Sequence, residues 1–327
     1  MLRRFPAVAL LTAMICVLSV VPALAQVFPS KTVFLVVPYP VGGSTDVIAR
    51  ALAIELNKLW GQAVVIENLS GAGSIIGASK VVNAPPDGHR LLLTIDPTVV
   101  SNRFVYKSLP YDPDKSLMPI TMIARGGLFI IANPSFPANN LRELVEATRS
   151  APGKFAYASA GIGTQTHLIM ETISKHEGVE LLHVPYKGGI APNLTAVMIG
   201  EVQATAASVA AAGSMVRSGR VKALAISSPQ RSGLFPDVPT MAESGFPYAN
   251  YVIWFGLFAP KGTSPQLVDR INRDVTGIVK RPDFTKKYIS AFGLDLVADT
   301  PAEFAAEIRA NVKLTAEMVK AAGVVPE

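Results

Sequence analysis

The sequence is almost without cysteine. Among its 327 residues only Cys16 is one, and it lies in an N-terminal segment that we expect to be removed. A mature chain without cysteine has no disulfide, no thiolate metal site and no cysteine nucleophile. Residues 13–15 (Ala-Met-Ile) are a poor lipoprotein cleavage site, so Cys16 is not read as a lipidation site either.

Histidine and hydrolase motifs are also scarce. The four histidines are His89, His167, His176 and His183, and none stands at metal-ligand spacing. The sequence has no GxSxG motif, so no serine hydrolase is indicated. Only His167 follows a glycine-rich loop, where it could touch a ligand. The other three are expected to be ordinary surface or turn residues.

Charge is sparse and scattered. Charged residues make up 17% of the chain, half of it is apolar, and the formal net charge is +6. This composition is typical of a globular protein. The densest basic run is Lys286-Lys287, whereas a nucleic-acid interface needs a clustered basic stripe. No nucleic-acid partner is therefore expected.

The first 25 residues have the pattern of a cleaved signal peptide. Arg3 and Arg4 precede the apolar run 7–21, and Ala23-Leu24-Ala25 fits the small-x-small cleavage rule. We expect a mature chain that starts near Gln26 in the periplasm. Losing the two arginines lowers the formal net charge to 28 − 24 = +4.

Strand-like runs alternate with helical patterns in the next hundred residues. Strands are expected at 32–39, 63–70 and 90–96, and helices at 46–60 and 75–83. This β-α-β-α-β order predicts a parallel sheet with helices on its faces.

The pattern restarts near residue 127, after a loop-rich segment (106–127). We therefore expect an α/β fold with two lobes, residues 26–124 with 251–327 and residues 125–250. Two extended crossings between such lobes make a hinged clamp. Ligands of open α/β sheets bind outside the carboxyl ends of the strands, which places the site between the lobes.

The stretch VPYPVGGSTDVIAR leads from the first expected strand into the first helix. Gly42 and Gly43 let the backbone turn tightly and let a ligand approach its N–H groups. Ser44, Thr45 or Asp46 can cap the helix. A helix start leaves N–H groups free and carries about +0.5 of a charge, so it suits a carboxylate or phosphate. A plain N-cap turn would have the same residues.

A second loop, SAGIGTQTHL at 159–168, repeats this chemistry with small residues, two glycines and hydroxyls ahead of a helix. Two such loops, one from each lobe, can close on one anionic ligand. Neither loop, 39–46 or 159–168, contains lysine or arginine. We therefore expect backbone N–H groups and hydroxyls to capture a carboxylate.

The glycine spacing at 71–77 suggests a different function, the binding of a dinucleotide. Gly71, Gly73 and Gly77 stand between a strand and a helix, with Asp96 at the end of the next strand, as in a dinucleotide-binding fingerprint. The spacing is GxGxxxG instead of GxGxxG, and the strand is the second of its lobe. An NAD(P)-dependent oxidoreductase is thus the weaker alternative, and no cofactor is expected.

The ordered motifs of the chain resemble those of the periplasmic solute receptors of tripartite tricarboxylate transporters, the Bug family. VVPYPVGGSTDVIAR is similar to the family's first loop and helix, with Val41 where proline is usual. GQAVVIENLSGAGSIIGA is similar to its second strand and glycine loop, with Leu69-Ser70 for Arg-Pro. APPDGHRLLL, LPYDPDKSLMPI, PGKFAYASAGIGTQTHL, HVPYKGG, GEVQA, GRVKALAISSPQRSGLFPDVPTMAESG and WFGLFAPKGTS follow in order. The match covers essentially the whole mature chain.

The resemblance implies a type II periplasmic-binding-protein-like clamp, in which each lobe has a mixed or parallel sheet with flanking helices. It implies a monomeric receptor, not an enzyme, that binds a small organic acid and delivers it to membrane transporter subunits. A receptor that signals to a sensor protein is the alternative. The loop at 71–77 is then a structural feature of the first lobe or part of the surface shown to the transporter.

The resemblance also implies that the two loops hold one ligand carboxylate, partly through ordered waters. No metal ligand is expected. The expected ligand-binding residues are Tyr39, Gly42, Gly43, Ser44, Thr45, Asp46, Ser159, Ala160, Gly163, Thr164, His167, Tyr186 and Ser208.

A third cleft segment departs from the family, with Ala207-Ser208 in place of Asp-Asn. The surrounding segment 203–213 offers hydroxyls but no charge. If its alanines form an apolar wall, a mono- or dicarboxylate with an apolar or aromatic body is favoured over citrate, because buried carboxylates need hydrogen bonds. The same alanines would also suit a packed strand that never meets the ligand. Citrate would need Lys187 as a counter-charge.

Overall fold

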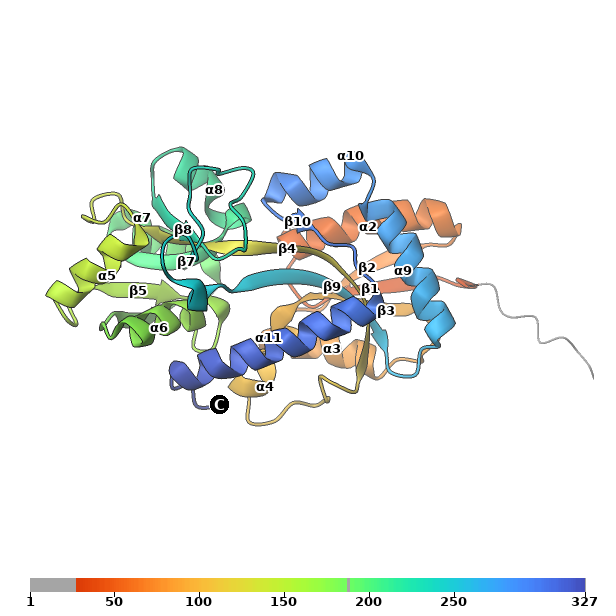
Figure 1. Cartoon of the computed structure of the whole chain (residues 1–327). Helices are drawn as coiled ribbons and strands as arrows, with labels where there is room; N and C mark the ends of the chain where they lie inside the picture. Colours follow the sequence, from red (N-terminus) through yellow and green to blue (C-terminus); the bar gives the residue numbers. More distant parts are fainter. Residues whose placement is uncertain (1–27, 187–188, 327) are drawn as a thin grey trace, which may run out of the picture.

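The structure is a computed structural model that describes residues 28–186 and 189–326. The expected signal peptide and Lys187 lie outside the described residues. Ten strands form one sheet in the order β2-β1-β3-β9-β4-β7-β5-β6, and β8 and β10 also pair with β4. Helices pack around this sheet (Figure 1). The expectation of an α/β fold is confirmed.

The first part of the sheet begins with three parallel strands. These are β1 (Val33–Val37), β2 (Val64–Asn68) and β3 (Arg90–Ile95), connected by α2 (Ser44–Trp60) and α3 (Ile75–Val82). β1 is buried along nearly its whole length, as expected of a parallel strand covered on both faces. The predicted β-α-β-α-β order is confirmed to within a few residues at each end.

Strand β4 (Leu117–Ala132) belongs to both parts of the sheet. Residues 117–127 pair antiparallel with β9 (Val252–Pro260). Residues 128–132 pair antiparallel with β7 (Ala204–Ser208) and β8 (Lys222–Ile226). The chain therefore passes from the first part of the sheet to the second within a single strand.

The prediction that 106–127 is loop-rich is wrong from Leu117 onward. Pro119 and Gly126-Gly127 weaken the strand pattern in the sequence. In the structure, register shifts beside Pro119 and after Met122 accommodate the irregular stretch. Gly127 is required by packing, because a Cβ there would lie 2.9 Å from the backbone nitrogen of Ser228.

The second part of the sheet contains β7, β8 and the parallel strands β5 (Ala156–Ser159) and β6 (Leu182–Pro185). Its helices are α5 (Leu141–Ser150), α6 (Gln165–Glu177), α7 (Ile190–Ile199) and α8 (Val209–Arg217).

The C-terminal region returns to the first part of the sheet. It contains α9 (Pro265–Val279), β10 (Asp295–Leu296) and α11 (Pro301–Ala321), and α11 runs along β4 and also contacts α6 (Figure 1). The remaining helices are short: η2 (Ala72–Ser74), η3 (Asp96–Thr98), α4 (Asn102–Val105), η4 (Pro247–Ala249), α10 (Pro282–Phe284), η5 (Thr285–Ile289) and η6 (Ser290–Phe292).

The core lies on both faces of the sheet. On one face of the first part, Leu52 of α2 and Ile271 of α9 are buried. On the other, Trp254 of β9 and Phe304 of α11 pack edge to face, with ring centroids 5.1 Å apart, next to Leu92 of β3. Burial on both faces makes the sheet a rigid support for the loops at its edges.

Strand directions bring the loops of the two parts together. β3 and β4 are both antiparallel to β9, so they run the same way, whereas β7 is antiparallel to β4. The carboxyl ends of β3 and β7 therefore point toward each other. Because β1 and β2 are parallel to β3, and β5 and β6 to β7, the loops that follow these strands lie at two facing edges.

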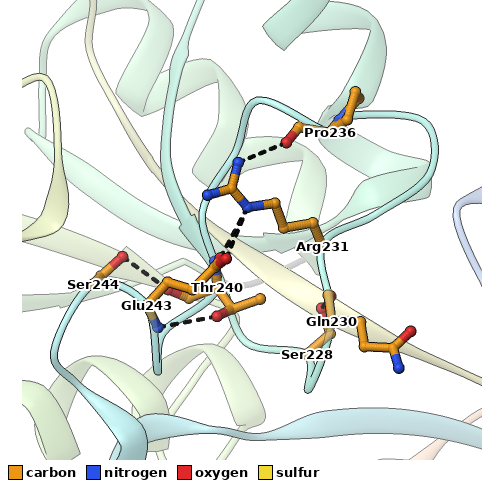
Figure 2. Close-up of polar contacts among 7 residues, drawn as sticks. All are labelled: Ser228, Gln230, Arg231, Pro236, Thr240, Glu243 and Ser244. Atoms are coloured by element: carbon orange, nitrogen blue, oxygen red, sulfur yellow. Dashed lines mark hydrogen bonds and ion pairs between the residues drawn. The ribbon is translucent and has the colours of Figure 1, made fainter.

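The segment between β8 and β9 is held by a polar cluster (Figure 2). Arg231 donates through Nε to both carboxylate oxygens of Glu243, at 3.1 and 2.9 Å, and through Nη1 to the carbonyl of Pro236 at 2.9 Å. Thr240 and Glu243 exchange bonds between side chain and backbone N–H, as in a capping box. The segment 237–246 is thus a turn fixed by an ion pair.

Candidate functional site

The loop after β1 presents a helix start with free donors. Gly43 is the N-cap of α2, with an extended backbone, and Gly42 has φ +90, which favours glycine. The N–H groups of the first turn have no partner within a helix. The hydroxyls of Ser44 and Thr45 make no hydrogen bond to the protein within the described residues.

Asp46 is bound by the loop itself. Its carboxylate accepts from the Gly42 N–H at 3.0 Å, Arg50 Nε at 2.9 Å and Asn68 Nδ2 at 2.9 Å. Burial opposes ionisation, yet the hydrogen bonds from Arg50, Gly42 and Asn68 lower the pKa of this carboxyl. Arg50 also offsets the negative charge that would otherwise repel an anion from the helix start. Asp46 thus positions the loop.

Tyr39 faces the sheet edge rather than open solvent. Its hydroxyl lies 3.2 Å from that of Thr94 and 3.3 Å from that of Thr98, and the Thr98 hydroxyl is 2.7 Å from Ser74 Oγ. Burial raises the pKa of Tyr39. These hydroxyls join the first loop to the end of β3 and to the glycine loop at 71–77.

The second loop contains a chain of hydroxyls. The Ala160 N–H donates to Thr166 Oγ1 at 3.0 Å, the hydroxyls of Thr166 and Thr164 are 3.0 Å apart, and Thr164 donates to the Gly161 carbonyl at 2.6 Å. The Gly161 N–H donates to Ser159 Oγ. The loop is therefore shaped by its own side chains, while the first-turn N–H groups of α6 stay free.

Two neutral histidines lie beneath the second loop. The Gly163 N–H donates to His167 Nδ1 at 3.2 Å. Burial, followed by repulsion from His183 when that ring is protonated, lowers the pKa of His167 to about 4. His183 Nε2 lies 2.6 Å from Ser159 Oγ. The expectation that His183 is an ordinary surface or turn residue is wrong, because it stands in β6, in register with Tyr157 of β5.

The two facing edges are in contact at Asp96, the residue after β3. Gln165, the first residue of α6, donates Nε2 to both oxygens of Asp96 at 3.2 and 3.1 Å, and the Tyr251 hydroxyl donates at 2.5 Å. A Cβ on Gly163 would lie 2.4 Å from a methyl group of Val105. The loops at the two helix starts thus belong to edges that touch.

A model of the tripartite tricarboxylate transporter family receptor matches residues 48–324. The chain belongs to this family.

Relatives of this receptor match it along most of their length. BugT of Bordetella pertussis is 34% identical over 306 residues, which cover 92% of each chain. A protein encoded between tcbD and tcbE of Pseudomonas sp. P51 is 37% identical over 257 residues, 78% of this chain and 76% of that one. The family is one of transport receptors, so the expectation that this protein is a receptor and not an enzyme is confirmed.

Solved structures agree with the fold of the receptor. The R. palustris protein Rpa4515 with adipate has a TM-score of 0.82 at 31% identity, covering 92% of this chain and all of that one. MatC of Rhodopseudomonas palustris with bound malate has a TM-score of 0.77 at 30% identity, covering 89% of this chain and all of that one. The α/β fold is that of periplasmic binding proteins.

The glycine loop at 71–77 has a packing role in the receptor. A Cβ on Gly77 would lie 2.7 Å from Pro38 and 2.9 Å from the Leu69 carbonyl, so glycine lets α3 pack against the chain that enters the first loop. Asp96 is buried against Gln165 and is not free to bind a ribose. In residues 28–186 and 189–326 no cluster of acidic, histidine or cysteine side chains could hold a metal ion.

Tyr186 and Ser208, two of the expected ligand-binding residues, lie in surroundings that differ from each other. The ring of Tyr186 packs against the apolar residues beneath α7 and α8, while its N–H donates to the Ser159 carbonyl at 2.9 Å. Ser208, at the carboxyl end of β7, caps α8 by accepting from the Ala211 N–H at 3.3 Å. Ser208 lies at the facing edge, whereas the Tyr186 hydroxyl is buried.

The alanines of β7 pack inside the sheet, which is the second of the two interpretations given for the third segment. Ala204, Ala206 and Ala207 are fully buried, because β7 lies inside the sheet and helices cover it. The apolar groups at the loops are instead Val41, 68% exposed, and Ile162, 48% exposed, one in each loop. Sequence reasoning did not single out Val41 or Ile162 as an exposed apolar group beside the helix starts, since an aliphatic residue in a glycine loop carries no distinctive pattern.

Replacing Asp46 with alanine should destabilise the receptor by about 1–3 kcal/mol, because the Gly42 N–H and the Asn68 amide lose their buried acceptor, whereas the lost pairing with the half-exposed Arg50 adds little. Urea denaturation measures this change. Glu55→Ala removes a partly exposed acid of the same helix that pairs with the exposed side chains of Lys58 and Arg281, and it should have a clearly smaller effect. Equal effects of the two substitutions would contradict the role given to Asp46.

Proposed function

We propose that the receptor captures a small organic mono- or dicarboxylate between two lobes and delivers it to the membrane subunits of a tripartite tricarboxylate-type transporter. One observation carries this proposal. Two helix starts with free N–H groups, α2 and α6, lie in loops at facing sheet edges, and neither loop contains a cation. Such an arrangement binds a carboxylate through hydrogen bonds and helix dipoles.

The lobes of the proposed clamp are residues 26–124 with 251–327, and residues 125–250. β4 changes its partner strand between Gly127 and Leu128, and Tyr251 directly precedes β9. These two crossings would act as the hinge. Cleavage after residue 25 would place the receptor in the periplasm, where relatives such as BugD are described as binding proteins. We expect a monomer.

The proposed ligand contacts fall into two groups. Direct or water-mediated donors are the N–H groups of the first turns of α2 and α6 and the hydroxyls of Ser44, Thr45 and Thr164. The supporting groups shape these loops from below: Tyr39, Asp46, Ser159 and His167, with Gly42 and Gly163 supplying the turns. Thr164 would turn its hydroxyl from the Gly161 carbonyl to the ligand.

The far end of the ligand would meet Ser208, the start of α8 and the exposed aliphatic groups of Val41 and Ile162. A hydroxyl and a helix start can hold a second carboxylate. Two aliphatic groups favour an apolar segment between the carboxylates. Adipate in the relative Rpa4515 has this chemistry, and malate in MatC is a shorter dicarboxylate.

Calorimetry with adipate, malate, benzoate and citrate tests the ligand class. We expect adipate to bind most tightly and its dimethyl ester not to bind, because esterification removes the anion. At 100 times its dissociation constant, a ligand that binds only the folded receptor should stabilise it by about 2.7 kcal/mol. Tight binding of citrate with no response to adipate would contradict the proposed lining and point to Lys187 as a counter-charge.

A further inference from the structure

Asp96 is a carboxyl group with no cation beside it. It is fully buried, and its hydrogen-bond donors are Gln165 of α6 and Tyr251, the residue before β9. Gln165 stands in the proposed second lobe and follows the ligand loop directly, whereas Asp96 directly follows β3, the central strand of the first. The contact therefore exists only while the two edges are together.

The surroundings of Asp96 suit a neutral carboxyl as well as a charged one. Burying a carboxylate without a cation is unfavourable, and the neutral acid avoids this cost. Thr315 Oγ1 of α11 has no hydrogen-bond partner within the described residues and lies beside Tyr251. When Asp96 carries a proton, the Tyr251 oxygen can accept it in a hydrogen bond and turn its own hydrogen toward Thr315.

We propose that Asp96 is a proton-dependent latch between the lobes. As a neutral carboxyl held by Gln165 and Tyr251 it keeps the receptor closed, and as a carboxylate it favours the open form. This inference rests on the proposed clamp function and adds to it a means of release. Because Gln165 is the first residue of α6, the latch also positions the second ligand loop.

The direction of the pH dependence follows from the surroundings of Asp96. Burial raises the pKa of Asp96 to about 7, although hydrogen bonds from Tyr251 and Gln165 act against this. In an open, hydrated cleft it should return to about 4. The closed form therefore binds the proton more tightly, so closure is fully supported below about pH 4 and is lost as the pH rises through about 7.

Other groups around Asp96 do not titrate in this range. Tyr39 of the first loop and Tyr251 are the titratable side chains that face it in the described part of the chain, and burial raises the pKa of both. Gln165 from α6, Thr98 from its own segment and Thr315 from α11 carry no charge. His167 and His183, which lie beneath the second loop, contact Gly163 and Ser159 and not Asp96.

The test measures adipate affinity and the ligand-free radius of gyration between pH 6.5 and 8.5, above the range in which adipate itself titrates. Wild-type affinity should fall about threefold or more as the pH rises, and the ligand-free protein should expand. Asp96→Asn keeps the shape of the neutral acid and should bind with an affinity independent of pH. Asp299→Asn removes another carboxyl with a raised pKa, bonded within the first lobe to the Met122 N–H, and should keep the wild-type slope.

The outcomes separate the latch from the proposed ligand class. An Asp96→Asn protein that keeps the wild-type pH dependence overturns the latch. If adipate fails to bind but the ligand-free expansion still disappears in Asp96→Asn, the ligand class fails and the latch stands. If Asp96→Asn does not fold, infrared spectra of the Asp299→Asn protein decide: a protonated-carboxyl band present at pH 5.5 and lost by pH 8.5 supports the latch, and its absence at pH 5.5 overturns it.

Discussion

Replacing Gly43 with valine should abolish carboxylate binding and leave the receptor folded. Gly43 has φ −71 and ψ 164, a conformation that valine adopts readily, and a Cβ there meets only the Pro40 carbonyl, at 3.8 Å. The new isopropyl group would instead stand where a ligand must approach the N–H groups of α2. Losing two hydrogen bonds to a charged group costs about 3–6 kcal/mol, which lowers affinity by about 10²–10⁴-fold.

Titration calorimetry with adipate measures this loss, and thermal unfolding verifies the fold. Gly233→Val is the matched control, because Gly233 also lacks a positive φ, has nothing within 4 Å of its Cβ position and lies outside both ligand loops. The control should bind adipate as the wild type does. Unchanged affinity in Gly43→Val would remove the first loop from the site.

Replacing Gly163 with alanine should prevent the two proposed lobes from closing. Its Cβ would lie 2.4 Å from a methyl group of Val105 across the interface, a distance that no packing tolerates. The second loop would then be held away from the ligand, and we expect affinity to fall about a hundredfold or more. Small-angle scattering should show no compaction when adipate is added.

A double substitution separates the clash from backbone strain. Gly163 has φ +74, so alanine there also costs about 1–2 kcal/mol. Gly178→Ala carries similar strain, at φ +62 with no neighbour within 4 Å, and should leave binding unchanged. Adding Val105→Ala to Gly163→Ala removes the methyl groups and should restore at least tenfold in affinity. If Val105→Ala restores nothing, the clash is not what blocks closure.

Local features of the sequence were enough for the three parallel strands β1, β2 and β3 and for both loops. The β-α-β-α-β order follows from apolar periodicity, and the starts of α2 and α6 follow from the glycines and hydroxyl residues ahead of them. These features depend on residues a few positions apart, so the sequence carries them directly. The ordered motifs also determined the family, which the match over residues 48–324 confirms.

The roles of single residues depended on partners far away in the chain. Asp96 meets Gln165, 69 residues later, and Tyr251, 155 residues later. His183 reaches the second loop only because β6 pairs with β5.

The burial of the alanines in β7 likewise depends on its neighbours β4 and β5. Such contacts are set by the order and direction of strands, which no local pattern encodes. The sequence by itself therefore determined the family and the chemistry of the loops. The tertiary structure decided which polar groups support the loops, which remain free, and where the two edges meet.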